Sequence, residues 1–328
     1  MAALLDPLGR RLEYLRVSVV DSCNLRCFYC RPGESCKPRE AQTVLSRDKI
    51  VQAVRGAADV GIRKVRLTGG EPLLRSDIVG LTAQIAAIPG IEDLSLTTNG
   101  TRLAQLAAPL AEAGLKRVNI SLDSLDGRNF REITRGGRLK ATLAGIEAAF
   151  VAGLLPVKIN MVVMKGVNDH EVINFARLTL DRDIHIRFIE YMPMLGQEET
   201  WQRHYLPSSE IMSLCSTVAP LVGLTGDNFY GPARNFCFED ATGRLGFITP
   251  VSQHFCAQCN RLRLTSNGRL KPCLFSDVEV DLLPALQKGE NIQLLYHEAA
   301  RLKPAFSETS PAALGASCGP RGMVEIGG

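Results

Sequence analysis

Between residues 13 and 192, short runs of β-branched residues alternate with longer stretches that carry apolar residues at i, i+3 and i+4 spacing. The short runs predict strands at 14–20, 64–67, 93–97, 117–122, 157–163 and 184–191. Among the longer stretches, 46–60 and 141–152 predict helices, each followed by a turn glycine, and Ser46 is typical of a helix N-cap. Six such units predict an α/β fold in which parallel strands form a barrel-like sheet.

The pattern changes after Pro193. Residues 194–250 mix glycine, proline and aromatic residues, and a second group of cysteines follows between 256 and 273. We therefore expect a partial barrel over residues 1–195 and a C-terminal extension over 196–328 that closes the mouth of the barrel. Residues 303–322 contain prolines and glycines but few large apolar side chains, which predicts a poorly structured arm.

Composition and charge exclude several classes of protein. With 45% hydrophobic and 22% charged residues, the 328-residue chain is neither disordered nor collagen-like. No apolar run approaches the roughly 20 residues of a membrane span, and the first residues do not resemble a secretory signal, so a cytoplasmic protein without a membrane partner is expected. A net charge of +4 is too small to favour a nucleic-acid partner.

Ten cysteines are the unusual feature, and their spacing indicates metal binding. Cys23, Cys27 and Cys30 place three thiolates within eight residues. A structural zinc site normally needs a fourth protein ligand, whereas an iron–sulfur cluster with one open iron needs only three thiolates. A zinc loop and a chance grouping remain the alternatives for this segment.

Polar or glycine residues recur where the predicted strands end. The second strand leads into Thr68-Gly69-Gly70-Glu71-Pro72, the third ends at 97–100, and the fourth ends at Ser121. Lys158 lies on the fifth strand, and Met192 follows the sixth. Since one end of a barrel collects its loops into the active site, this recurrence predicts a site there.

The second cysteine group, Cys256, Cys259 and Cys273, again offers three thiolates. Arg261 and Arg263 follow at i, i+2 spacing on one face of an apparent strand. Their paired N–H donors could bind phosphate there. The alternative is a zinc knuckle completed by His254.

The segment Cys23-Asn24-Leu25-Arg26-Cys27-Phe28-Tyr29-Cys30, followed by Gly69-Gly70-Glu71-Pro72, resembles the radical S-adenosylmethionine (SAM) superfamily. The resemblance implies an incomplete, TIM-like (βα)6 barrel with a [4Fe-4S] cluster on the three cysteines. The open iron would chelate SAM, whose reductive cleavage gives a 5′-deoxyadenosyl radical. The resemblance implies SAM contacts from Tyr29, Gly69, Gly70, Glu71, Ser121 and Met192.

The segment from Gly246 to Arg263, together with the Gly327-Gly328 end, resembles more narrowly the GTP 3′,8-cyclase family of molybdenum cofactor biosynthesis. That resemblance implies a second [4Fe-4S] cluster on Cys256, Cys259 and Cys273, and a catalytic role for Gly327 and Gly328. The residues it implies for GTP binding are Arg16, Lys64, Arg66, Thr97, Lys158, Arg261, Leu262 and Arg263.

The reaction implied by this resemblance joins C3′ of GTP to C8 of its guanine after hydrogen abstraction, giving 3′,8-cyclo-7,8-dihydro-GTP. An external electron donor, a monomer or homodimer, and transfer of the product to cyclic pyranopterin monophosphate synthase are also expected. The rivals are a radical SAM enzyme that modifies or dehydrogenates peptides and a zinc-stabilised nucleic-acid-binding protein. Free thiols are expected at Cys36, Cys215, Cys237 and Cys318, and no role is assigned to His170, His185, His204 and His297.

Overall fold

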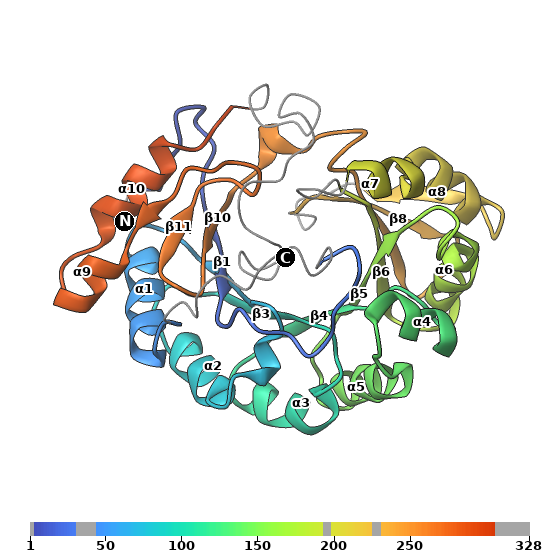
Figure 1. Cartoon of the computed structure of the whole chain (residues 1–328), viewed down its shortest axis with the longest axis horizontal. Helices are drawn as coiled ribbons and strands as arrows, with labels where there is room; N and C mark the ends of the chain where they lie inside the picture. Colours follow the sequence, from blue (N-terminus) through green and yellow to red (C-terminus); the bar gives the residue numbers. More distant parts are fainter. Residues whose placement is uncertain (1–2, 31–43, 193–197, 225–230, 306–328) are drawn as a thin grey trace.

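The computed structural model describes residues 3–30, 44–192, 198–224 and 231–305. Six parallel strands lie side by side in chain order and curve around a central space (Figure 1). They are β1 (Tyr14–Ser18), β2 (Lys64–Thr68), β3 (Asp93–Thr98), β4 (Arg117–Ser121), β5 (Val157–Val163) and β6 (Ile184–Glu190). The sequence prediction of an open barrel built from six βα units is confirmed.

Helices cover the outer face of these strands (Figure 1). They are α1 (Arg47–Asp59), α2 (Ile78–Ala86), α3 (Leu103–Glu112), α4 (Gly127–Thr134), α5 (Leu139–Val151) and α6 (Val172–Asp181), with short 3-10 turns at η1 (Pro72–Leu74) and η2 (Asp169–Glu171). As predicted, Ser46 caps α1: its hydroxyl accepts a hydrogen bond from the Lys49 backbone N–H at 3.4 Å.

The C-terminal extension continues the barrel sheet at both of its edges. β9 (Arg244–Ile248) pairs in parallel with β6, and β10 (Arg261–Leu264) pairs in parallel with β1. The remaining elements are α7 (Glu198–His204), α8 (Ser208–Ser216), β7 (Leu221–Leu224), β8 (Ala233–Phe238), η3 (Cys256–Gln258), β11 (Arg269–Lys271), β12 (Val280–Asp281), α9 (Leu283–Lys288) and α10 (Gln293–Arg301). The resulting order is β12-β11-β10-β1-β2-β3-β4-β5-β6-β9-β8-β7. The expected boundary at 195 lies outside the described residues and stays a prediction.

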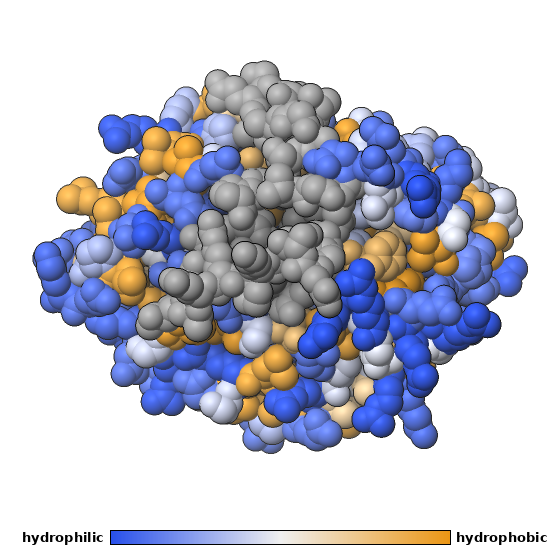
Figure 2. Space-filling view, viewed as in Figure 1, coloured by the Kyte–Doolittle hydropathy of each residue, from blue (hydrophilic) through white to orange (hydrophobic). Residues whose placement is uncertain are grey.

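The apolar core lies between the sheet and its covering helices. On β5 the burial alternates strictly, so that Val157, Ile159, Met161 and Val163 pack outward among the helices. The alternate positions of β5 face the inside of the barrel, because successive side chains of a strand point to opposite faces. On the face shown in Figure 2, hydrophilic side chains dominate the outer rim of the molecule. None of the described helices is both long enough and apolar enough to span a membrane.

Candidate active site

The inside of the barrel is a cavity of about 690 Å³, within the size range of sites for small molecules. It runs between the two cysteine groups, and all six of their cysteines line it. Among the described lining residues are ten arginines and lysines but only four aspartates and glutamates. Every described residue that the sequence analysis assigned to a site lines this cavity except Leu262.

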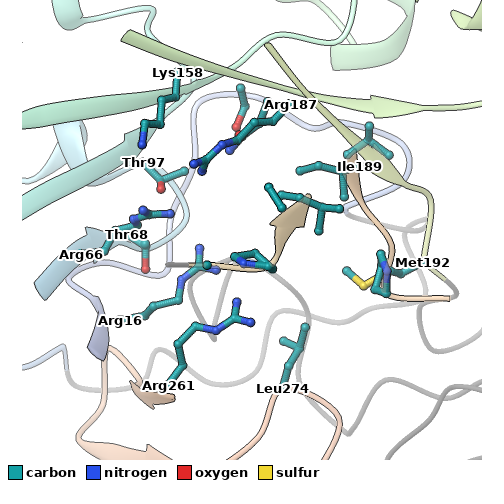
Figure 3. A pocket seen from close by; sticks show the side chains of 18 of the residues that line it. Arg16, Arg66, Thr68, Thr97, Lys158, Arg187, Ile189, Met192, Arg261 and Leu274 are labelled. Atoms are coloured by element: carbon teal, nitrogen blue, oxygen red, sulfur yellow. The ribbon is translucent and has the colours of Figure 1, made fainter. Parts of the chain in front are cut away.

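Strand register brings the predicted cations into rows. Arg16 of β1 is the register partner of Arg66 on β2 and of Arg263 on β10. Two residues earlier, Tyr14 stands between Lys64 and Arg261 in the same way. Because residues two apart on a strand share a face, both rows face the cavity, where Figure 3 shows the side chains of Arg16, Arg66 and Arg261 converging.

Two basic residues of β6 that line the cavity were not predicted as site residues. Arg187, the register partner of Asn160, points into the same space as Lys158 and Thr97 (Figure 3). His185, the register partner of Lys158, also lines the cavity. The strict alternation of residues 184–190 could have identified both as inward-facing, but single side chains on one strand carry no motif spacing.

The cations of the cavity destabilise one another's charged forms. Burial and the neighbouring Arg187, Arg117 and Arg66 lower the pKa of Lys158 to about 6, against a weak opposing effect of Asp93. Burial and the charge of Arg263 likewise hold the pKa of Arg16 well below its usual value. Like charges held together in a poorly solvated space favour an anionic ligand that neutralises them.

The carboxylates that line the cavity already have partners, and the ion pair among them offsets only one of the ten cations. Asp93 forms an ion pair with Arg117. The carboxylate of Glu190 accepts hydrogen bonds from the backbone N–H groups of Ser208, Val251 and Ser252. The cavity therefore keeps an excess of positive charge for a ligand.

Polar atoms inside the barrel also lack partners. The hydroxyl of Thr97, Oδ1 of Asn160 and Nε of Arg187 are buried, and none of them has a hydrogen-bond partner within the described ranges. All three residues line the cavity. Since buried polar groups are nearly always hydrogen-bonded in a finished site, these atoms fit contacts to a polar ligand.

The first cysteine loop is held against the barrel by its own backbone. The N–H of Phe28 donates to the carbonyl of Ile133 at 3.1 Å, and the N–H of Cys30 closes a turn on Cys27 at 3.0 Å. The amide of Asn99 lies 3.8 Å from the Cys23 sulfur. Burial, Asp123 and the other two thiols raise the pKa of the Cys27 thiol, because each negative charge nearby disfavours a further thiolate.

Gly69 and Gly70 allow the first cysteine loop to approach the end of β2 closely. A Cβ on Gly70 would lie 2.2 Å from the carbonyl oxygen of Ser22, and a Cβ on Gly69 would lie 2.4 Å from that of Val20. Glu71 follows, and its buried carboxylate accepts hydrogen bonds from Thr98, Asn99 and the Leu73 N–H. Gly69, Gly70 and Glu71 all line the cavity. In this structure they join the first cysteine loop to β2 and β3.

The second cysteine group is assembled by a hairpin. The N–H of Cys259 closes a turn on Cys256 at 3.0 Å, which repeats the turn in the first loop. β10 then pairs with β11 in antiparallel fashion, with Arg263 opposite Lys271, so the chain returns to place Cys273 beside the start of β10. Burial opposes ionisation of the Cys259 thiol, but Arg261 and Lys303 outweigh it and lower its pKa to about 6.

The two cysteine groups fit clusters better than single metal ions. In the part of the chain that the structure describes, no three His, Cys, Asp or Glu side chains gather closely enough to hold one metal ion. His254, the residue considered for completing a zinc knuckle, also lines the cavity. Three thiolates facing a shared cavity are the donor set that a [4Fe-4S] cluster with one open iron requires.

The remaining predicted residues either do not line the cavity or lie outside the described residues. Leu262 is fully buried in the core, on the opposite face of β10 from Arg261 and Arg263, so only its main chain is available to a ligand. Gly327 and Gly328 lie outside the described residues, as do Cys36 and Cys318. Cys215 is buried on α8, and Cys237 lies on β8.

Known proteins resemble the chain over nearly its whole length. Residues 17–179 match the Radical SAM superfamily, and residues 184–308 match the family described as Molybdenum Cofactor Synthesis C. A GTP 3′,8-cyclase of Listeria monocytogenes is 47% identical over 94% of this chain and 93% of its own length. The chain belongs to the GTP 3′,8-cyclase family. The chain is also similar to the GTP 3′,8-cyclase of Geobacter sulfurreducens, with 50% identity over 89% of both chains. The GTP 3′,8-cyclase of Moorella thermoacetica is 45% identical over 98% of this chain and 99% of its own length.

Solved structures support the fold of this cyclase-family chain. SuiB of Streptococcus suis bound to S-adenosylmethionine superposes with a TM-score of 0.60 at 18% identity, covering 88% of this chain and 68% of SuiB. SuiB bound to the precursor peptide SuiA gives a TM-score of 0.62 at 17% identity, covering 94% and 71%. At this identity the likeness shows a shared radical SAM fold alone.

Proposed function

We propose that the chain is a radical SAM lyase that converts GTP to (8S)-3′,8-cyclo-7,8-dihydroguanosine 5′-triphosphate, an early step of molybdenum cofactor biosynthesis. The observation that carries this proposal is the pair of cation rows between two cysteine triplets in one cavity. The cyclases of three bacteria, at 45–50% identity, support the same activity.

Two [4Fe-4S] clusters and SAM are the cofactors. Cys23, Cys27 and Cys30 would hold the cluster that binds SAM, and Cys256, Cys259 and Cys273 the other. When bound, these groups supply one-electron chemistry that removes a hydrogen atom from the substrate. The residues proposed to contact SAM are Tyr29, Gly69, Gly70, Glu71, Ser121 and Met192.

This chain's own residues bind and orient the nucleotide. A triphosphate carries close to four negative charges. The side chains of the cation rows offer several N–H donors that can bind its oxygens together. We assign triphosphate binding to Arg16, Lys64, Arg66, Lys158, Arg261 and Arg263, joined by the unpredicted Arg187. Thr97 and Asn160 offer buried polar atoms for the rest of the nucleotide. Fixing the substrate in this cavity supplies the positioning that the reaction needs.

A catalytic role for Gly327 and Gly328, contact of Leu262 with GTP, and a cytoplasmic location stay predictions. So do an external electron donor, a monomeric or homodimeric state, and transfer of the product to cyclic pyranopterin monophosphate synthase.

The test is an anaerobic incubation of the protein with GTP, SAM and a strong reductant, assayed by mass spectrometry. We expect both 5′-deoxyadenosine and the cyclised nucleotide, from a protein that carries about eight irons. Guanosine serves as the matched control, because it keeps the reacting atoms and lacks the triphosphate. Equal conversion of guanosine, or 5′-deoxyadenosine without a cyclised product, would contradict the proposal.

A further inference from the structure

A buried lysine lies directly behind the second cysteine group. Lys303 follows α10, which packs beside β11 (Figure 1), and only 5% of its surface is exposed. Its ammonium donates hydrogen bonds to the carbonyls of Arg261 at 2.8 Å and Pro272 at 2.7 Å. Arg261 lies two residues after Cys259, and Pro272 immediately precedes Cys273. One side chain therefore joins the two segments that carry these cysteines.

The charge of Lys303 also faces the thiols themselves. Its ammonium hydrogen-bonds the Cys259 sulfur. Burial lowers the pKa of Lys303, the thiols of Cys259 and Cys273 act in the opposite direction, and the cations Arg10 and Arg261 add to the lowering. Within the described ranges no carboxylate forms an ion pair with Lys303. A buried ammonium needs a nearby negative charge, and here the cysteine group provides it.

A second buried lysine of the same region is bonded differently. Lys271, which is 1% exposed, donates to the carbonyl of Ser276 at 2.7 Å and lies 3.4 Å from the carboxylate of Glu279. Its charge is thus neutralised by an ordinary ion pair. The contrast shows that a buried lysine in this part of the fold does not by itself require thiolates.

Cys256, the remaining cysteine of the group, is connected to the Lys303 segment by Arg10. Arg10 forms an ion pair with Asp6 and donates to the carbonyls of Cys256 at 2.7 Å and Pro304 at 3.0 Å. Because Pro304 follows Lys303 directly, Arg10 ties the position of Lys303 to that of Cys256.

We propose that Lys303 is a positioning residue of the second cluster. It holds the segments of Cys259 and Cys273 in place, and its fixed positive charge beside their thiolates raises the reduction potential of the cluster. The charge acts in this direction because the reduced cluster is more negative than the oxidised one, so a nearby cation stabilises the reduced form more. This inference rests on the proposed function, in that it assumes a cluster on Cys256, Cys259 and Cys273.

The test isolates the second cluster in the full-length chain. In a reference variant, Cys23, Cys27 and Cys30 are all replaced by serine, so that only the second group can bind iron. Lys303→Met, Lys303→Arg and the control Lys271→Met are added to this background. Iron and sulfide per chain are measured after anaerobic reconstitution, and the midpoint potential is measured by a titration followed by electron paramagnetic resonance.

We expect about four irons in the reference variant. Lys303→Met should shift the midpoint potential to more negative values or lose at least half of the iron, whereas Lys303→Arg and Lys271→Met should match the reference in both measurements. If Lys303→Met does not fold, Lys303→Gln, which keeps N–H donors without the charge, replaces it with the same expectation. A purely structural clamp would leave the potential of the loaded protein unchanged.

The inference would be overturned by an unchanged potential in a fully loaded Lys303→Met protein, or by an equal shift in Lys271→Met. Either result would leave the proposed function intact. Absence of iron from the reference variant would instead refute the second cluster, and with it both this inference and that part of the proposed function.

Discussion

The hydroxyl of Tyr29 donates a hydrogen bond of 2.6 Å to Oδ2 of Asp123, and Oδ1 of the same carboxylate accepts from the Val162 N–H at 2.9 Å. Asp123, which lines the cavity, thereby connects the first cysteine loop to β5. Burial raises the pKa of Asp123 to about 6, while these two hydrogen bonds act in the opposite direction. The hydroxyl of Tyr29 is thus held by a residue of the barrel, while its ring also contacts Phe28 of its own loop.

Tyr29→Phe should therefore loosen the part of the cavity proposed for SAM. Loss of one hydrogen bond to a buried carboxylate is worth about 1–2 kcal/mol, so SAM should bind roughly five- to thirtyfold more weakly, as measured by calorimetry on the reconstituted protein. Tyr14→Phe is the control, because it removes a buried hydroxyl that has no partner within the described ranges. Equal SAM affinity in the Tyr29→Phe and Tyr14→Phe proteins would count against the assignment.

Gly70→Ala should displace the first cysteine loop. The new methyl group would collide with the backbone of Ser22 at 2.2 Å, and backbone cannot move aside as a flexible side chain can. We expect a loss of stability of about 1–3 kcal/mol in chemical denaturation, together with a lower iron content. Gly127→Ala is the matched control, since a Cβ there meets nothing within 4 Å. If the Gly70→Ala protein bound as much iron as the native protein and were equally stable, the close approach of Ser22 to Gly70 would not be needed to hold the first cysteine loop.

Cys27→Ser should abolish SAM cleavage and leave the second cluster in place. Removing one of three thiolates leaves the first cluster with too few ligands, so iron should fall from about eight to about four per chain, and 5′-deoxyadenosine should not form. Cys237→Ser is the control, because Cys237 lies on β8 outside both groups. Production of 5′-deoxyadenosine at the native rate by Cys27→Ser would refute the ligand assignment.

Replacing both Arg261 and Arg263 by alanine should weaken GTP binding far more than SAM binding. Hydrogen bonds to charged groups contribute about 1.5–3 kcal/mol each, so the combined loss in GTP affinity should be at least about 100-fold. Arg269→Ala on β11 is a suitable control, because Arg269 is paired with Asp281 at 3.0 Å and does not line the cavity. A similar loss of affinity for both ligands would show that the two arginines serve the fold and not the triphosphate.

Local sequence patterns were sufficient to predict the barrel strands. Alternating β-branched residues placed each strand within two residues of its observed ends, and Ser46 identified the start of α1. The attachment of the extension to both edges of the sheet could not be predicted in this way. β9 and β10 owe their places to pairing with β6 and β1, and such long-range pairing leaves no local signal in short strands.

In the candidate site too, groupings along the chain could be predicted from the sequence, whereas groupings made by strand pairing could not. Cysteine spacing and the paired arginines of β10 are visible in the sequence because they lie close together along the chain. The row formed by Arg16, Arg66 and Arg263 depends on strand register, which joins residues from three separate segments. Arg187 and Lys303 are single cations without motif spacing, so the sequence alone did not assign them to the site that they line.

Lys158 should make GTP binding depend on pH. In the free protein its pKa is lowered to about 6, so the side chain is mostly neutral at pH 7.5, and a bound triphosphate would favour its protonated form. GTP binding at that pH should therefore take up a proton, and affinity should fall as the pH rises through and above 6. Calorimetry in buffers with different ionisation enthalpies measures this uptake. Lys158→Met should abolish it, whereas Lys165→Met, which removes an exposed lysine, should not. Proton uptake that persisted unchanged in Lys158→Met would assign the titration to another group.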